Sequence, residues 1–159
     1  MEHRQSGLNG DFGIMIEGVG RRDLDDPDFQ HHAFDLWTRH GGLLAVRGDD
    51  LAALSPAALV AWSEVFGAVE QEGMTGRGNM SVPGYPILKI GNVRDAAGNL
   101  KASLARVPEL ASDDDIRYNP ETRRPVWHTD STFRKPPPIG SVFHCRLAPD
   151  RGGETLFAD

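Results

Sequence analysis

Apolar residues in the first half of the chain recur with two different periods, which predict alternating strands and helices. A short apolar run at residues 13–19 is bounded by glycines, as expected of a strand, and residues 43–46 form a second such run. Between these runs, four apolar residues recur at the spacing of one helix face: Phe29, Ala33, Leu36 and Trp37. The pattern therefore predicts a strand, a helix and a strand in succession.

Capping residues mark where two helices begin. Asp26 before Pro27 is a typical start, because a carboxylate accepts from the free amides and proline suits the first helical position, and Gly41 is a good stop. Ser55 and Pro56 predict the start of a second helix by the same chemistry. The apolar face and the end of this second helix are indicated by Leu59, Trp62, Phe66 and Gly67.

The second half of the chain alternates between strand-like and polar stretches. Residues 85–90, 139–147 and 154–158 have apolar or alternating patterns that predict strands. Residues 92–126 are charged and contain proline and glycine, with too few apolar residues to bury much surface. They predict a long loop, which is either an active-site cover or a disordered segment. Because helices come early and strands late, the predicted fold class is α+β.

Composition is that of one soluble globular domain over residues 1–159, with 39% hydrophobic and 25% charged residues. We find no signal segment and no membrane span, so we expect a cytoplasmic protein. The formal net charge of −6 argues against a general nucleic-acid binder but leaves a small anionic substrate open. Cys145 is the single cysteine, so any metal must be held by His, Asp or Glu.

A histidine and an aspartate two residues apart, His128 and Asp130, are the first candidates for chemistry. On an extended chain such residues point to the same side, so both side chains can reach one metal ion. A second histidine from elsewhere would complete the two-histidine, one-carboxylate set that leaves open positions on iron(II). The spacing alone is common, and a surface strand with a simple hydrogen bond explains it as well.

The residues around this pair form a longer pattern. Trp127 precedes it, a proline run follows at 136–138, and a strand-like segment leads to Gly152-Gly153-Glu154-Thr155. This pattern closely resembles the TauD/TfdA family of iron(II)/2-oxoglutarate dioxygenases, densely over residues 127–159 and more loosely over residues 13–91. The resemblance implies a double-stranded β-helix, or jelly roll, with N-terminal helices, of which this chain carries the N-terminal portion.

The resemblance also implies the reaction partners and three of the residues that hold them. It implies Fe(2+), 2-oxoglutarate and O2, with His128 and Asp130 as iron ligands and Thr155 as a contact to a carboxylate of 2-oxoglutarate. Related halogenases lack the carboxylate ligand, so Asp130 favours hydroxylation of a C–H bond with release of succinate and CO2. The family's second iron-binding histidine and its 2-oxoglutarate-binding arginine come later than residue 159. His144 is better interpreted as a partly buried strand residue than as that distal ligand.

The remaining histidines are interpreted structurally. His31, His32 and His40 belong to the first predicted helix, where we expect them to face solvent or to cap the helix. His3 lies in a chain end that we expect to be disordered.

Substrate contacts are predicted by the same resemblance. The histidine and tyrosine that contact substrate in the taurine-oxidising member of the family correspond to Glu72 and Thr75, and its asparagine falls near Arg124. These differences argue against taurine. Arg124 could pair with an anionic group on a small substrate, although Arg123-Arg124 also fits a solvated basic pair. Asn92 is a further candidate, which a strand-end turn explains equally well.

Three classes of protein remain open at this point. The first is a hydroxylase that acts on a small molecule, with no nucleic acid or membrane partner and with homo-oligomerisation undecided. The second is a truncated, non-catalytic homologue that acts as a metal-binding or interaction module. The third, a cupin-type metalloenzyme, would normally show a more histidine-rich ligand set. Asp130 and the segment ending in Thr155 favour the first.

Overall fold

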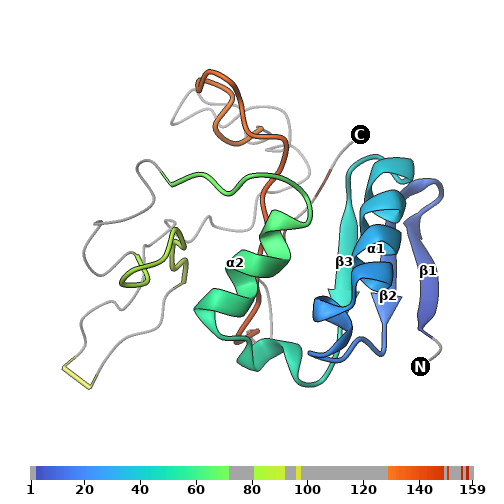
Figure 1. Ribbon diagram of the computed structural model, residues 1–159, viewed down its shortest axis with the longest axis horizontal. Coiled ribbons are helices and arrows are strands. Elements are labelled where there is room, and N and C mark those ends of the chain that lie inside the picture. The colour runs from blue at the N-terminus through green and yellow to red at the C-terminus, as the bar shows by residue number, and fades with distance from the viewer. Residues whose placement is uncertain are drawn as a thin grey trace. The chain divides into compact units, whose positions relative to one another are not determined.

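The computed structural model describes residues 3–71, 81–91, 96–97, 129–148, 150, 155 and 157 (Figure 1). The chain divides into two compact units. One comprises Met1–Val69 with Val142–Asp159, and the other comprises Glu70–Ser141. Within the described residues, every helix and every strand of more than an isolated bridge lies in the first unit.

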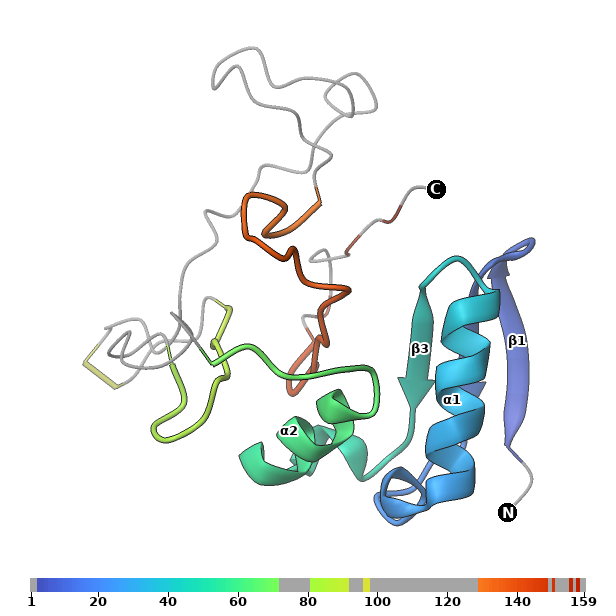
Figure 2. The same cartoon turned by 45° about the horizontal axis from the view of Figure 1, so that its top comes forward.

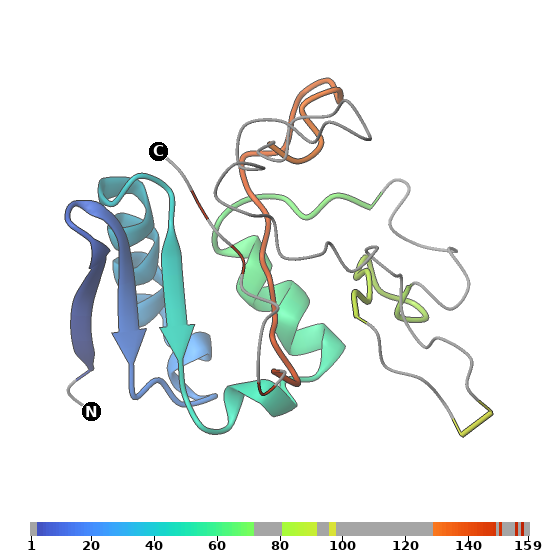
Figure 3. The same cartoon turned by 180° about the vertical axis from the view of Figure 1, so that it is seen from behind.

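A three-stranded mixed sheet is the base of the first unit. Its strands are β1 (Arg4–Asn9), β2 (Phe12–Glu17) and β3 (Leu44–Arg47), in the order β1-β2-β3. β1 runs antiparallel to β2, and β2 runs parallel to β3. The parallel pair requires a crossover connection, which the helix α1 (Pro27–Arg39) provides. Figures 2 and 3 show α1 lying against one face of this sheet.

The ends of α1 follow the sequence prediction. The Asp26 carboxylate accepts a hydrogen bond from the backbone N–H of Asp28 at 3.0 Å, and Pro27 occupies the first turn. The helix ends at His40, whose N–H donates to the Leu36 carbonyl at 3.1 Å. Gly41 follows with a φ of 68°, a left-handed conformation that glycine adopts without a steric penalty.

The second helix, α2 (Pro56–Glu64), begins as predicted and ends earlier than predicted. The Ser55 hydroxyl accepts from the N–H of Ala58 at 3.2 Å. After Glu64 the chain continues to Gly67 in a tighter turn, in which each N–H donates to a carbonyl three residues back. The last predicted turn of α2 is thus present in a 3-10-like form, which is common at helix ends.

The core of the first unit lies where α1, α2 and the sheet meet. Phe29 of α1 and Trp62 of α2 stack with ring centroids 6.0 Å apart, and Ile16 of β2 is fully buried. The buried apolar residues of this core are Ile14, Ile16, Val19, Leu24, Phe29, Ala33, Leu36, Leu51, Leu54 and Trp62. The periodic positions predicted for α1 are among them, except for the half-buried Trp37.

The chain from His3 onward is ordered, contrary to the expectation of disorder at His3. β1 pairs along its length with β2, and the His3 ring is 3.1 Å from the Asp23 carboxylate. No apolar pattern marks β1 in the sequence, because all six of its residues are exposed. Backbone pairing with β2, which hydrophobic patterns do not report, determines this strand.

Two predicted strands are wrong and a third is only partly described. Residues 85–90 do not form a strand; Leu88 instead makes an isolated bridge to Ser81 across a turn. Residues 139–147 form no strand, and Thr155 and Phe157, the described residues of 154–158, are not in one. A strand needs a neighbour for its backbone groups, and no other described segment pairs with residues 139–147.

The predicted long loop, 92–126, lies outside the described residues except for residues 96–97, which are in a turn. The α+β class is confirmed by the mixed sheet and two helices of the first unit. In the described part of the chain, no helix is both long and apolar enough to cross a membrane.

Candidate metal-binding turn and neighbouring residues

Asp130 is an exposed residue at the start of a turn in the second unit. The turn covers residues 130–133 and is closed by the N–H of Arg134, which donates to the Ser131 carbonyl at 3.0 Å. Ser131 has a φ of 56°, an uncommon left-handed conformation for a residue with a Cβ. Asp130 therefore lies in a turn, and the relative orientation of the His128 and Asp130 side chains stays a prediction. His128 lies outside the described residues.

Arg134 joins this turn to a distant part of the second unit. Its Nη1 donates to Oε1 of Glu70, which lies 64 residues earlier in the chain. The two side chains are only 26% and 34% exposed, so solvent screens the pair less than a surface pair. The guanidinium also lies 5.8 Å from the centroid of the Phe133 ring. Sequence reasoning missed this pair, because nothing in the pattern relates positions so far apart.

The donor chemistry of the turn fits iron(II). An exposed carboxylate at Asp130, with an imidazole two positions earlier in the sequence, supplies the oxygen and nitrogen donors that a two-histidine, one-carboxylate site requires. No group of three His, Cys, Asp or Glu side chains able to hold a metal occurs within the described residues, which leave out His128. Those residues therefore supply one of the predicted metal ligands.

His144 is half-buried in the first unit, as interpreted from the sequence, although it is not in a strand. Its Nε2 lies 2.7 Å from the backbone carbonyl of Leu51. A carbonyl oxygen only accepts hydrogen bonds, so Nε2 must carry the proton and cannot offer a lone pair to a metal while this bond holds. The contact supports a structural role for His144.

The other predicted site residues are placed less fully. Thr155 is exposed, and its role as a 2-oxoglutarate contact stays a prediction. The four candidate substrate contacts lie outside the described residues: Glu72, Thr75, Asn92 and Arg124. Their roles stay predictions.

The helix histidines are where the sequence indicated. His31 and His32 are exposed, and His40 is the C-terminal cap of α1. The Nε2 of His32 lies 2.8 Å from the amide nitrogen of Gln5 on β1, so this side chain ties the helix to the edge of the sheet.

Two carboxylates in the first unit have clearly lowered pKa values. The pKa of Asp23 is lowered mainly by the N–H of Gly20, which donates to it at 2.7 Å, and then by His3. The pKa of Glu17 is lowered mainly by the hydrogen-bonded Arg4, and further by the charge of Arg47 across the sheet. Both carboxylates stabilise the fold, because each interacts with residues that folding brings near it: Glu17 within the sheet and Asp23 in the turn that follows β2.

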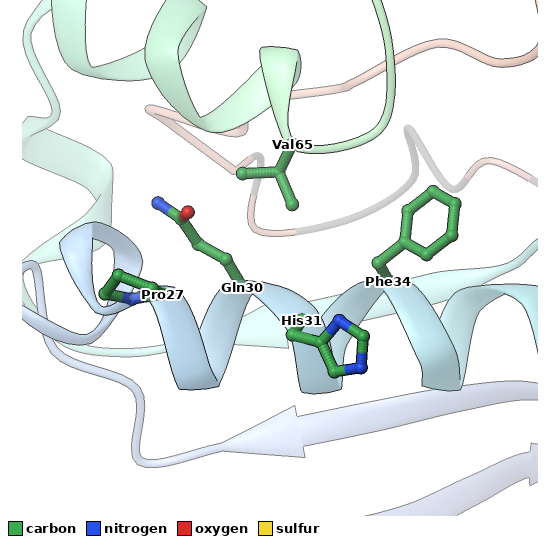
Figure 4. A pocket seen from close by; sticks show the side chains of 5 residues that line it. All are labelled: Pro27, Gln30, His31, Phe34 and Val65. Carbon is green, nitrogen blue, oxygen red and sulfur yellow. The ribbon is translucent and has the colours of Figure 1, made fainter.

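A shallow depression of about 360 Å³ lies beside α1 in the first unit. Its lining comes from α1 and from the end of α2 (Figure 4). The residues are Pro27, Gln30, His31 and Phe34 of α1, and Val65 after α2. Its lining contains no carboxylate, so it does not offer the donor set of an iron site.

The mixed sheet, the crossover helix and the carboxylate-bearing turn define an α+β protein with one described candidate metal ligand. Residues 8–159 match the family described as "Taurine catabolism dioxygenase TauD, TfdA family", and the chain belongs to this family. The resemblance noted from the sequence is thereby confirmed.

A curated relative extends this comparison. The chain is 28% identical over 155 residues to an (S)-phenoxypropionate/alpha-ketoglutarate-dioxygenase from Sphingobium herbicidovorans. The aligned region covers 96% of this chain and 43% of the relative, so the chain spans less than half of that protein's length. No solved structure matches the chain significantly.

Proposed function

We propose that this chain is part of an Fe(II)/2-oxoglutarate-dependent dioxygenase that hydroxylates a C–H bond of a small organic anion, with release of succinate and CO2. The observation that carries the proposal is the family match over residues 8–159, which includes both His128 and Asp130. The name of the Sphingobium relative, a dioxygenase of alpha-ketoglutarate, supports the same cosubstrate. The three-stranded sheet would then belong to the larger jelly roll of the complete domain.

His128 and Asp130 would hold the iron, and Asp130 is an exposed residue of its turn. Iron and 2-oxoglutarate, when bound, would supply the chemistry by which O2 oxidises the substrate. Thr155 would donate its hydroxyl proton in a hydrogen bond to a carboxylate of 2-oxoglutarate, and so orient it. The family's second histidine and its carboxylate-binding arginine would complete the site from residues beyond 159.

Two observations support a small organic anion as the substrate class. The relative's name contains phenoxypropionate, a carboxylate, and a guanidinium such as that of Arg124 recognises a carboxylate with two parallel hydrogen bonds. Asn92, Glu72 and Thr75 are the other residues that we propose to line the substrate side of the site. We propose that the enzyme acts in the cytoplasm.

Metal titration of this chain tests the ligands. We expect Asp130→Asn and His128→Ala each to weaken Fe(II) binding, measured anaerobically, by more than about tenfold, since loss of an outer-shell partner alone costs at least that much. Asp11→Asn is the matched control, because Asp11 is an exposed carboxylate of the β1–β2 turn. Unchanged affinity in Asp130→Asn would remove Asp130 from the ligand set.

Turnover distinguishes an enzyme from a non-catalytic module. With Fe(II), ascorbate and O2, we expect succinate from 2-oxoglutarate only when the family's second histidine and its arginine are present. Residues 1–159 alone should therefore form none. If the longer protein also forms none with any carboxylate substrate offered, the non-catalytic alternative holds.

A further inference from the structure

An ion pair between Arg134 and Glu70 connects the turn that carries Asp130 to a distant segment of the second unit. Arg134 is also the residue whose N–H closes the turn onto the Ser131 carbonyl. The same residue therefore fixes the local shape of the turn through its backbone and its position through its side chain.

The Arg134 side chain is largely buried, so its ion pair with Glu70 is important for where the side chain lies. Its side chain is 26% exposed, and its Nε is buried with no hydrogen-bond partner among the described residues. The guanidinium thus depends on Glu70 for its charged contact within that part of the chain. Removing the carboxylate would take away the charged partner that Arg134 has in that part of the chain, and a half-buried charge without its partner is costly. We expect Arg134 to move toward water in response, and the turn to move with it.

A metal ligand must be held close to its productive position, since small displacements weaken binding steeply. We infer that the Arg134–Glu70 ion pair positions the Asp130 turn for metal binding. Arg134 and Glu70 are positioning residues in this inference, which rests on the proposed function, and neither touches the metal.

Amide exchange and metal affinity together test the inference on this chain. Glu70→Gln keeps the size of the side chain and removes its charge. We expect the Arg134 amide, bonded to Ser131, to exchange about fivefold faster in this variant, and the Fe(II) dissociation constant to rise by about the same factor. Arg134→Gln should have the same effects.

Three further variants separate positioning from general stability. Glu70→Asp keeps the charge on a shorter stem and should fall between the wild type and Glu70→Gln. The exchanged pair Glu70→Arg with Arg134→Glu should restore part of both losses. Asp35→Asn is the matched control, because it breaks the Arg39–Asp35 ion pair of α1 in the first unit and should change neither measurement at the turn.

The outcomes also separate this inference from the proposed function. If Glu70→Gln and Arg134→Gln exchange and bind Fe(II) within twofold of the wild type, the inference is overturned while the metal site stands. If the wild-type chain binds no Fe(II), the proposed metal site fails. Exchange at the Arg134 amide then decides whether Glu70 holds the turn. Faster exchange without rescue by Glu70→Asp or by the exchanged pair would also overturn the role of the charge pair.

Discussion

At the scale of single residues, Gly48 controls how closely the chain can pass between β3 and the end of β2. The N–H of Val19 donates to the Arg47 carbonyl at 3.1 Å, which holds these two backbone segments together. A Cβ added at Gly48 would overlap the Val19 carbonyl oxygen, a backbone atom that cannot move without disturbing that contact. The sequence places a glycine here, but only the folded chain shows what it must approach.

We therefore expect Gly48→Ala to lower the free energy of unfolding by about 2–4 kcal/mol, because the overlap is with backbone and not with a flexible side chain. Gly20→Ala is the control. Its Cβ would lie 3.5 Å from an Asp23 carboxylate oxygen, an ordinary contact, so the change should stay below about 1 kcal/mol. Urea unfolding of both variants measures the difference. Equal values would show that the chain relaxes around Gly48 at little cost.

The two carboxylates with lowered pKa values, Glu17 and Asp23, predict a loss of stability in acid. Their stabilising contribution is fully present above the unfolded-state pKa, near 4, and is lost as the pH falls through the lower folded-state pKa. The free energy of unfolding should therefore decline below about pH 5. Urea unfolding between pH 7 and pH 3 measures it. Glu17→Gln should flatten part of this decline, and an unchanged slope in that variant would contradict the assignment.

At the scale of elements, the helices were predictable and the strands were less so. Asp26 and Ser55 each accept a backbone hydrogen bond within three residues along the chain, so the signal and the structure that it reports lie in one short segment. A strand depends instead on a partner elsewhere. β1 was missed because its side chains are exposed, and residues 139–147 were predicted as a strand although no described segment pairs with them.

The two serines of the α2 region provide a matched test of helix capping. We expect Ser55→Ala to cost about 1 kcal/mol of stability, because the N–H of Ala58 loses its acceptor. Ser63 donates to the Leu59 carbonyl within the helix, a bond that competes with helix geometry, so Ser63→Ala should change stability by less than about 0.5 kcal/mol. Thermal unfolding of both variants compares them. A larger loss for Ser63→Ala would mean that this internal bond outweighs the cap.

At the scale of the whole molecule, the described core belongs to the first unit. It brings together elements that are far apart in the sequence, from β2 to α2. Trp62 of α2 is 7% exposed and stacks on Phe29 of α1, with Phe66 packed against its edge at a centroid distance of 5.3 Å. This contact holds α2 against the helix that covers the sheet.

Trp62→Ala should therefore cost about 3–5 kcal/mol, because it removes a large buried side chain and leaves a cavity. Leu147→Ala is the control, since Leu147 is 77% exposed and its removal should cost less than about 0.5 kcal/mol. Chemical unfolding followed by far-UV circular dichroism measures both. If Trp62→Ala is no more damaging than Leu147→Ala, α2 does not depend on this core.

The sequence by itself determined the two helices with their caps, strands close to β2 and β3, the α+β class and the family. Each of these follows from a local pattern: the spacing of apolar residues, a capping residue, or a dense run of motif residues ending in Thr155. Folding decided the pairing of β1, the close approach at Gly48 and the turn around Asp130. It also joined Arg134 to Glu70. These features depend on backbone hydrogen bonds, steric contacts and charges between segments far apart in the chain, which no local pattern records.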